Sequence, residues 1–255
     1  MARIKAVDFD ERLTLVEHLD ELRTRIFIAG GTLLVALVLC FVFNHVLLDI
    51  ANGPLPEGFE PVTFSPSEPF LTTLTLCLYG AIVISLPVIL YQLYAFVLPA
   101  FSPTERRVAT PLLMLVPILF IAGVVFCYFV VLTPALDFLL NFNADEFNTQ
   151  VRARDYYSFI TLLMLAMGIG FQIPVGVIAA CRLGVTSPEK LRASRRYAIV
   201  AIAVLAALLP TLDPLTLILE MIPLILLYEL SIWLASVLGR PSPEVADQIA
   251  SAEGS

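Results

Sequence analysis

The feature that most constrains this chain is the absence of any charged residue between Pro69 and Thr104. That stretch is longer than the roughly 20 residues a helix needs to cross a bilayer. Other apolar stretches recur along the chain, which is 59% hydrophobic and only 15% charged. Because about a quarter of the residues in a soluble domain are charged, this composition predicts an all-α, polytopic membrane protein.

Six stretches are candidate transmembrane helices: residues 26–48, 71–97, 109–132, 157–181, 197–212 and 214–237. The fifth is short, since 16 residues separate Arg196 from Asp213. They make a helix of about 24 Å, against about 30 Å of hydrocarbon. We expect one six-helix membrane domain over residues 1–238 and a disordered cytoplasmic tail over residues 239–255.

Two prolines and one loop are expected to shape these helices. Pro69 ends a proline-rich loop that favours extended chain, and Pro87 permits a bend within the second span. After the third span, the segment TPALDFLLNF predicts a separate short helix with Thr133 as its N-cap and Pro134 in its first position. We expect that helix to lie at the outer membrane interface.

The distribution of Lys and Arg predicts the orientation. With six spans, 13 of the 15 basic residues fall on the side of the two termini. Only Arg152 and Arg154 fall on the other side. Cytoplasmic loops carry an excess of basic residues, so both termini are expected in the cytoplasm and the protein in the cytoplasmic (inner) membrane.

Several classes of function find no support in the sequence. The four cysteines are isolated, and neither they nor the two histidines have the spacing of a metal site. There is no phosphate-binding loop and no HExxH or GxSxG motif. No basic surface with interleaved aromatic residues indicates nucleic acid. We therefore expect no enzyme activity, no cofactor, no metal and no nucleic-acid partner.

Acidic residues stand at the point where the chain enters the membrane, in EHLDELRTR over residues 17–25. An apolar stripe from Leu15 to Ile26 predicts an amphipathic helix along the inner interface, with Glu17, Glu21 and Arg25 on an adjoining face. One interpretation is a surface ion pair between Glu21 and Arg25, worth about 0.2–0.5 kcal/mol. The other is a receptor for a cationic ligand.

A second acidic residue of this kind is Glu105, in PAFSPTERR between the second and third spans. It accompanies Arg106 and Arg107. Ser102 or Thr104 could cap the third helix, with Glu105 in the favourable first turn. A binding role and a capping role are compatible.

Polar residues within the predicted spans are the third candidate site. Asp213, Glu220 and Glu229 lie in or beside the last span, where a charge costs about 2.5–3.5 kcal/mol. Gln172 lies in GIGFQIPVG of the fourth span, among small residues and a proline that permit close packing or a kink. Asp213 could instead cap the sixth helix ahead of Pro214. Such groups are either functional or hydrogen-bonded packing contacts.

The motifs together resemble the TatC family, the signal-recognising multispanning subunit of the twin-arginine protein translocase. The resemblance runs over about residues 15–237 and rests on motifs in family order: HLDELRTR, SPSEPF, LPAFSPTERR, GFQIP, LPTLDP and IPLILLYELSI. It implies a concave, glove-shaped bundle of six helices. It also implies binding of twin-arginine signal peptides and export of folded proteins, powered by the proton-motive force.

The resemblance also implies roles for particular residues and partners. His18, Glu21 and Arg23, with Glu105 and Arg106, would form the signal-peptide site, since carboxylates bind guanidinium groups by charge-assisted hydrogen bonds. Partners would be TatA- and TatB-like single-span subunits and further copies of this chain.

The sequence departs from the family at two positions: Gln172 stands where Glu is frequent, and Leu217 where Gln is frequent. We hypothesise that Gln172 and Glu220 share the family's intramembrane polar role. The alternative function is a secondary transporter in which Gln172, Glu220 and Asp213 line a pathway. Its expected broken-helix repeats are not evident.

Overall fold

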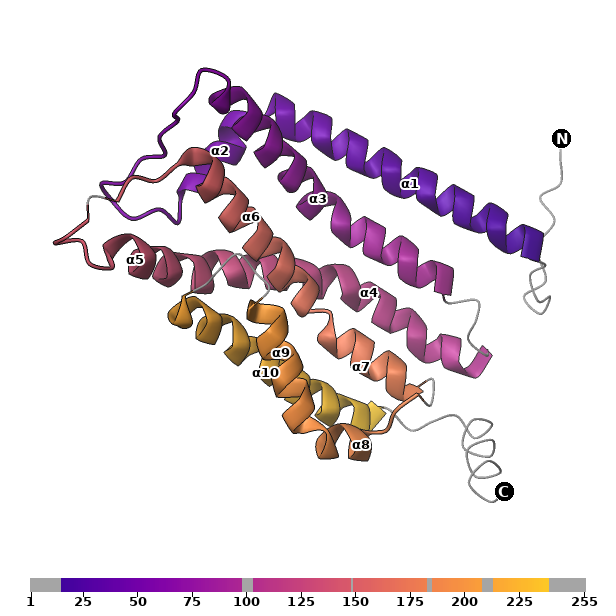
Figure 1. The fold of residues 1–255 in the computed structure, drawn as a ribbon. Coiled ribbons are helices and arrows are strands. Elements are labelled where there is room, and N and C mark those ends of the chain that lie inside the picture. The colour runs from indigo at the N-terminus through magenta and orange to yellow at the C-terminus, as the bar shows by residue number, and fades with distance from the viewer. Residues whose placement is uncertain (1–14, 98–102, 148, 183–184, 208–212, 239–255) are drawn as a thin grey trace, which may run out of the picture.

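The computed structural model describes residues 15–97, 103–147, 149–182, 185–207 and 213–238. These residues form helices that run between two ends of the molecule (Figure 1). At the α8 end, α1 begins, α3 and α10 end, and the short helix α8 lies at one edge, beside the beginning of α9. At the α2 end, α1 ends, α3 and α6 begin, and α2 lies with the loops around it.

The helices have the following bounds: α1 Leu15–Val42, α2 Asn44–Asn52, α3 Glu68–Val97, α4 Pro103–Phe126, the π-helical segment η2 Cys127–Leu132, α5 Thr133–Asn141, α6 Ala153–Gly170, α7 Ile173–Arg182, α8 Pro188–Ala193, α9 Arg195–Ala207 and α10 Pro214–Leu238. Within the described ranges the extended chain pairs only at an isolated parallel bridge between Val62 and Arg152.

Among the described residues, five stretches are long and apolar enough to cross a membrane, which confirms a helical, multi-pass membrane protein: Asp20–Val42, Glu68–Phe96, Met114–Asn141, Ala153–Arg182 and Pro214–Val237. The fifth predicted span corresponds to α9, which has 13 residues. At 1.5 Å per residue that helix is about 20 Å long. The rest of the predicted span, residues 208–212, lies outside the described residues.

The first helix differs from the prediction at both ends. The amphipathic segment expected along the inner interface and the first span are one continuous helix, α1. That helix ends at Val42, before the predicted boundary, and α2 begins at Asn44. The Asn44 side chain donates a hydrogen bond to the Phe41 carbonyl oxygen at 2.7 Å, and such local bonds compete with the helical ladder.

The expected short helix after the third span is present as α5, but it is not separate from that span. α4, η2 and α5 follow one another without a break, and Thr133 is not an N-cap because Leu132 before it already has helical backbone angles. Pro134 has no N–H to bond the carbonyl of Val130, which lies in η2. The helix continues past this proline through a wider π-helical turn instead of restarting.

The fourth predicted span is kinked where the small residues and proline permitted it. α6 ends at Gly170, residues 171–172 form a turn, and α7 begins at Ile173. Pro174 lacks the N–H that would bond the Gly170 carbonyl. The Phe171 N–H still bonds the Met167 carbonyl oxygen at 2.9 Å, but the Gln172 N–H bonds the Ile169 carbonyl oxygen, three residues back, at 2.9 Å. The helical ladder is therefore interrupted here and the chain changes direction.

Three tyrosines fix α2 against the rest of the bundle. Tyr128 donates to the Ile50 carbonyl oxygen at 2.8 Å, and Tyr156 donates to the Ala51 carbonyl oxygen at 2.6 Å. Tyr157 donates to Oδ1 of Asn52 at 2.9 Å. The last carbonyls of a helix lack partners within it, so the Tyr128 and Tyr156 hydroxyls supply partners for the end of α2. All three hydroxyls attach α2 to η2 or α6.

The helices approach each other closely at glycines, while large apolar side chains cover the outside. An ideal Cβ on Gly123 of α4 would lie 2.7 Å from the Met167 carbonyl oxygen and 2.9 Å from the Gly168 Cα of α6. Small residues at such contacts let two backbones pack directly. Many large apolar side chains are exposed on four of the five candidate spans, as expected of a surface that faces lipid, whereas Ala153–Arg182 exposes only Ile169.

We predict that Gly123→Ala destabilises the protein by about 1–3 kcal/mol, because the added methyl would collide with backbone atoms that cannot move independently. Thermal unfolding of the detergent-solubilised protein measures the effect. Gly30→Ala is the matched control, since nothing lies within 4 Å of its Cβ position in α1. Equal melting temperatures for the two variants would contradict the close α4–α6 contact.

Candidate functional site

Glu21 is part of a polar cluster at the α8 end that joins two helices. The Arg25 guanidinium forms an ion pair with Glu21 one turn before it on α1. It also donates a hydrogen bond from Nη1 to Oε1 of Gln92 on α3, at 3.0 Å. The Glu21 side chain remains 26% exposed. The cluster therefore holds a carboxylate in a fixed place that is still accessible from outside.

The predicted ion pair between Glu21 and Arg25 is confirmed, but sequence analysis missed its third member. Gln92 is the only amide side chain in the charge-free stretch, and that was the available signal. Only the packing of α1 against α3 brings it to Arg25, 67 residues earlier in the chain.

Arg23 lies on α1 between Glu21 and Arg25 in sequence, but it is not part of their cluster with Gln92. Its side chain is exposed, and its guanidinium carbon lies 5.8 Å from the centre of the Phe27 ring. A cation over an aromatic ring at that distance is weakly attracted to it. His18 lies in the first turns of α1, and its side chain is outside the described residues.

Glu105 and Arg106 lie in the first turn of α4, which begins at Pro103. A carboxylate is favoured there by the partial positive charge of the helix N-terminus, as the capping interpretation predicted. The side chains of both residues are outside the described part of the chain. That Glu105 and Arg106 form one site with Glu21 therefore stays a prediction.

Gln172 occupies the turn between α6 and α7 and is buried, with 9% of its surface exposed. Its Nε2 donates to the Val116 carbonyl oxygen of α4 at 3.2 Å and to the Gly168 carbonyl oxygen at 3.4 Å. The amide thus bonds the kink in the fourth span to α4. A hydrogen-bonded packing contact is one of the two roles that the sequence left open for this residue.

The two acidic residues at the start of α10 have different surroundings. Asp213 accepts a hydrogen bond from the Thr216 backbone N–H at 2.8 Å, which confirms it as the cap of α10. Glu220 is completely buried, near Cys127 of the π-helical segment η2. π-helical turns often occur at functional positions. The buried Glu220 carboxyl group beside such a turn is therefore a stronger functional candidate than Asp213, which caps a helix.

Glu229 is exposed and ion-paired, whereas Glu220 is buried. Its Oε2 accepts a hydrogen bond from Nη2 of Arg195 at 2.7 Å, and the two side chains are 42% and 50% exposed. This ion pair attaches α9 to α10 near the α8 end. The ion pair is exposed, and it forms because the pairing of α9 with α10 brings Arg195 within reach of Glu229.

The two prolines with expected structural roles lie within α3. Pro69 is the second residue of α3, where its missing N–H costs nothing, and Pro87 lies inside the helix.

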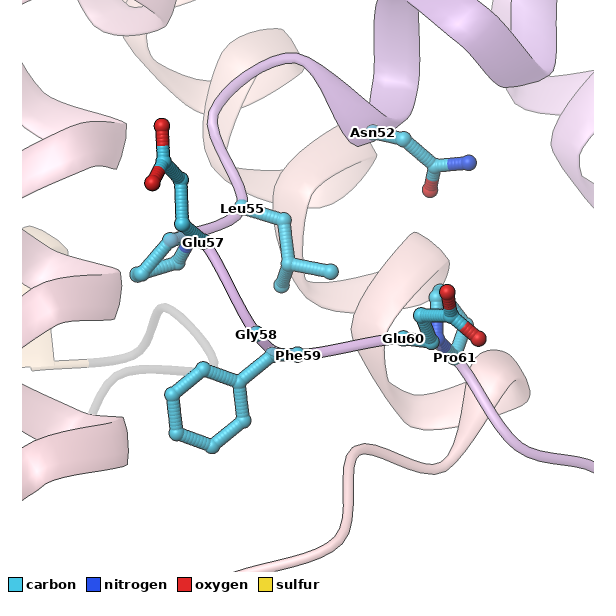
Figure 2. Close-up of a pocket in the computed structure, with 8 residues that line it drawn as sticks. Asn52, Leu55, Glu57, Gly58, Phe59, Glu60 and Pro61 are labelled. Carbon is cyan, nitrogen blue, oxygen red and sulfur yellow. The ribbon is translucent and has the colours of Figure 1, made fainter.

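A hollow in the loop after α2 is lined by Asn52 and residues 55–61 and has a volume of about 460 Å³. Figure 2 shows the carboxylates of Glu57 and Glu60 at opposite sides of it, pointing apart. Throughout the described part of the chain, no group of three or more His, Cys, Asp or Glu side chains is placed to hold a metal ion. The hollow therefore offers no shared carboxylate site.

Comparisons with known proteins identify the family. A family model described as Sec-independent protein translocase protein (TatC) matches residues 17–223. The chain belongs to the TatC family. The TatC protein of Magnetococcus marinus is 32% identical over 242 residues, which cover 93% of this chain and 89% of the relative. The TatC protein of Aquifex aeolicus is 35% identical over 238 residues, which cover 91% of this chain and 99% of the relative.

A solved structure agrees with these relatives. The crystal structure of the twin-arginine translocase receptor TatC in DDM is 36% identical and superposes with a TM-score of 0.75, covering 88% of this chain and 100% of that one. TatC proteins belong to a protein-transport family, so the chain is a component of the Tat translocase and not an enzyme. Membership decides against the small-solute transporter alternative.

One pair at the α2 end was not among the predicted sites of this TatC protein. Nε of Arg152 donates to Oε1 of Glu68 at 2.7 Å, and Glu68 is only 4% exposed. The hydrogen bond to Glu68 raises the pKa of Arg152. The SPSEPF motif contains Glu68, but its partner lies 84 residues away and only the fold reveals it.

We predict that Glu229→Gln lowers the free energy of unfolding by no more than about 1 kcal/mol, because exposed ion pairs contribute little. Unfolding at low salt and at about 1 M salt measures the effect, and the difference from the unmodified protein should vanish at high salt. A large, salt-independent loss would mean that Glu229 has a buried role.

Proposed function

We propose that this TatC protein binds twin-arginine signal peptides at its α8 end, which faces the cytoplasm, and organises partner subunits for export of folded proteins. Family membership over residues 17–223 supports this role, and the similar crystal structure is named as a twin-arginine translocase receptor. The predicted orientation supports the side, since basic residues concentrate in the segments next to the α8 end.

The observation that carries the proposal is the Glu21–Arg25–Gln92 cluster. It presents a partly exposed carboxylate on the rigid α1–α3 pair, already matched to a guanidinium group. A signal-peptide arginine offers the same planar donor and can bind that carboxylate by charge-assisted hydrogen bonds. The second arginine of the signal would bind Glu105, with His18, Arg23 and Arg106 at the edge of the site.

The buried polar residues have a second proposed role. Glu220 is completely buried and Gln172 nearly so, so a partner helix cannot reach them without moving α10 or the α6–α7 kink. We infer that TatA- and TatB-like single-span subunits act on this region through helix packing. Asp213, which caps α10, would hold the start of the moving helix.

The proposed setting is the cytoplasmic membrane, where the proton-motive force drives transport. In the proposed topology, residues 1–238 form one domain in which α9 is a short fifth span beside the five longer ones. The 16 residues between Arg196 and Asp213 make at most about 24 Å of helix, which is shorter than the roughly 30 Å of hydrocarbon, so the bilayer must thin beside it. Copies of the chain would associate within the complex.

We predict that Glu21→Gln and Glu105→Gln each weaken binding of a peptide containing SRRxFLK by about tenfold or more, since a hydrogen bond to a charged group is worth about 1.5–3 kcal/mol. Fluorescence anisotropy with the detergent-solubilised protein measures the affinity. Changing RR to KK in the peptide should weaken binding too, because Lys lacks the forked donor. Raising the salt concentration should weaken binding of the unmodified pair.

Glu57→Gln is the matched control for this prediction, because it removes an exposed acidic residue at the α2 end. Its peptide affinity should equal that of the unmodified protein. Unchanged affinity in both Glu21→Gln and Glu105→Gln would contradict the proposed site. Reduced yield of folded Glu105→Gln alone would instead support a purely capping role for that residue.

We predict that Glu220→Leu reduces co-purification of TatA- and TatB-like subunits and export of a twin-arginine reporter, while peptide binding stays normal. Glu229→Gln is its control on the same helix. Export and co-purification at the unmodified level in Glu220→Leu would remove Glu220 from the proposed partner-responsive region.

A further inference from the structure

Arg152 and Arg154 stand out because the predicted orientation places them alone on the outer side, against the usual bias of basic residues. Both lie at the beginning of α6, beside the beginning of α3, at the α2 end (Figure 1). The candidate spans Glu68–Phe96 and Ala153–Arg182 begin at this level. These arginines therefore lie where the hydrocarbon of the membrane meets its headgroups.

Backbone pairing fixes the two segments together. The Val62 N–H bonds the Val151 carbonyl oxygen at 2.8 Å, and the Ala153 N–H bonds the Val62 carbonyl oxygen at 2.9 Å. This bridge places Arg152 beside Glu68. One Glu68 oxygen accepts from Arg152, and the other accepts from the Phe64 N–H at 2.8 Å. The acidic residue is thereby neutralised and both of its oxygens are occupied.

A cavity of about 250 Å³ opens beside this pair, lined by Ser65, Glu68, Leu71, Thr72, Thr75, Arg152 and Arg154. One acid and two arginines give the lining a net charge of +1. Asp155 acts on Arg152 electrostatically but does not line the cavity. Arg154 is exposed, so its charge is available to a ligand in the cavity.

Thr72 supplies an independent sign of a ligand. It is only 5% exposed and lines the cavity, yet its hydroxyl has no hydrogen-bond partner within the described structure. Thr75, one turn on, is different because its hydroxyl bonds the Leu71 carbonyl oxygen at 2.8 Å. A buried hydroxyl without a partner costs about 1–3 kcal/mol, and an acceptor in the cavity would recover that cost.

We propose that this cavity binds the phosphate group of a phospholipid from the outer leaflet. A phosphate oxygen accepts from the Thr72 hydroxyl, and Arg154 donates charge-assisted hydrogen bonds to the same group. Leu71 lines the cavity, and the centre of the Phe64 ring lies 5.9 Å from the guanidinium carbon of Arg152. These two side chains have 55% and 65% of their surfaces exposed, which suits contact with acyl chains. The site goes beyond the proposed signal-peptide function and lies at the opposite end of the molecule.

The experiment distinguishes recognition of the phosphate group from binding of the acyl chains. The full chain in detergent is mixed with phosphatidylglycerol, with a diacylglycerol of the same acyl chains, or with inorganic phosphate. Native mass spectrometry measures bound ligand, and thermal unfolding measures the stabilisation that binding causes. We expect phosphatidylglycerol alone to bind and to raise the melting temperature.

Two variants test the residues. Arg154→Gln should weaken phosphatidylglycerol binding by about tenfold, the loss of one charge-assisted hydrogen bond. Thr72→Val should also weaken it, yet leave the lipid-free melting temperature unchanged or higher, because the replaced hydroxyl has no partner. Arg192→Gln is the control, since it removes a basic residue of α8 at the opposite end.

Three results would overturn the proposal. Phosphatidylglycerol binding at the unmodified level in both Arg154→Gln and Thr72→Val would place bound lipid elsewhere. Equal stabilisation by inorganic phosphate would make this a site for free phosphate. Equal binding of the diacylglycerol would mean that the apolar side chains alone retain lipid.

Discussion

The structure depends on the requirement that backbone polar groups find partners within the protein when lipid surrounds them. Helices meet that requirement locally, so the chain crosses the membrane as helices and departs from helical bonding at few places. Each departure has a specific substitute. The π-helical segment η2 accommodates Pro134, and Gln172 bonds the kink between α6 and α7 to α4. At the end of α2, the hydroxyls of Tyr128 and Tyr156 serve the same purpose.

The same constraint separates two kinds of polar site. At the ends of the bundle, charged side chains can remain partly exposed to solvent and can exchange partners. The Glu21–Arg25 pair and the Arg195–Glu229 pair are examples. Within the bundle, Glu220 and Gln172 are enclosed and can respond only when helices move. In the proposed function, ligand recognition therefore belongs to the ends of the bundle, and coupling to partner subunits belongs to its interior.

Much of the fold followed from particular patterns in the sequence. The charge-free stretch after Pro69 predicted α3, and Pro174 with its neighbouring glycines predicted the break between α6 and α7. Asp213 ahead of Pro214 predicted the cap of α10. The prediction of a separate helix at Thr133 failed because a proline after a polar residue resembles a helix start, whereas a preceding π-helical turn lets the helix continue.

The sequence by itself determined the membrane-spanning helical character, the family and the residues of the candidate signal site, because apolar length and short motifs are local properties. Only the tertiary structure decided which of these residues have partners. Arg25 reaches Gln92, Arg195 reaches Glu229 and Arg152 reaches Glu68 across 67, 34 and 84 residues. Such contacts depend on how whole helices pack, and helix packing is set by surfaces that no single stretch of sequence contains.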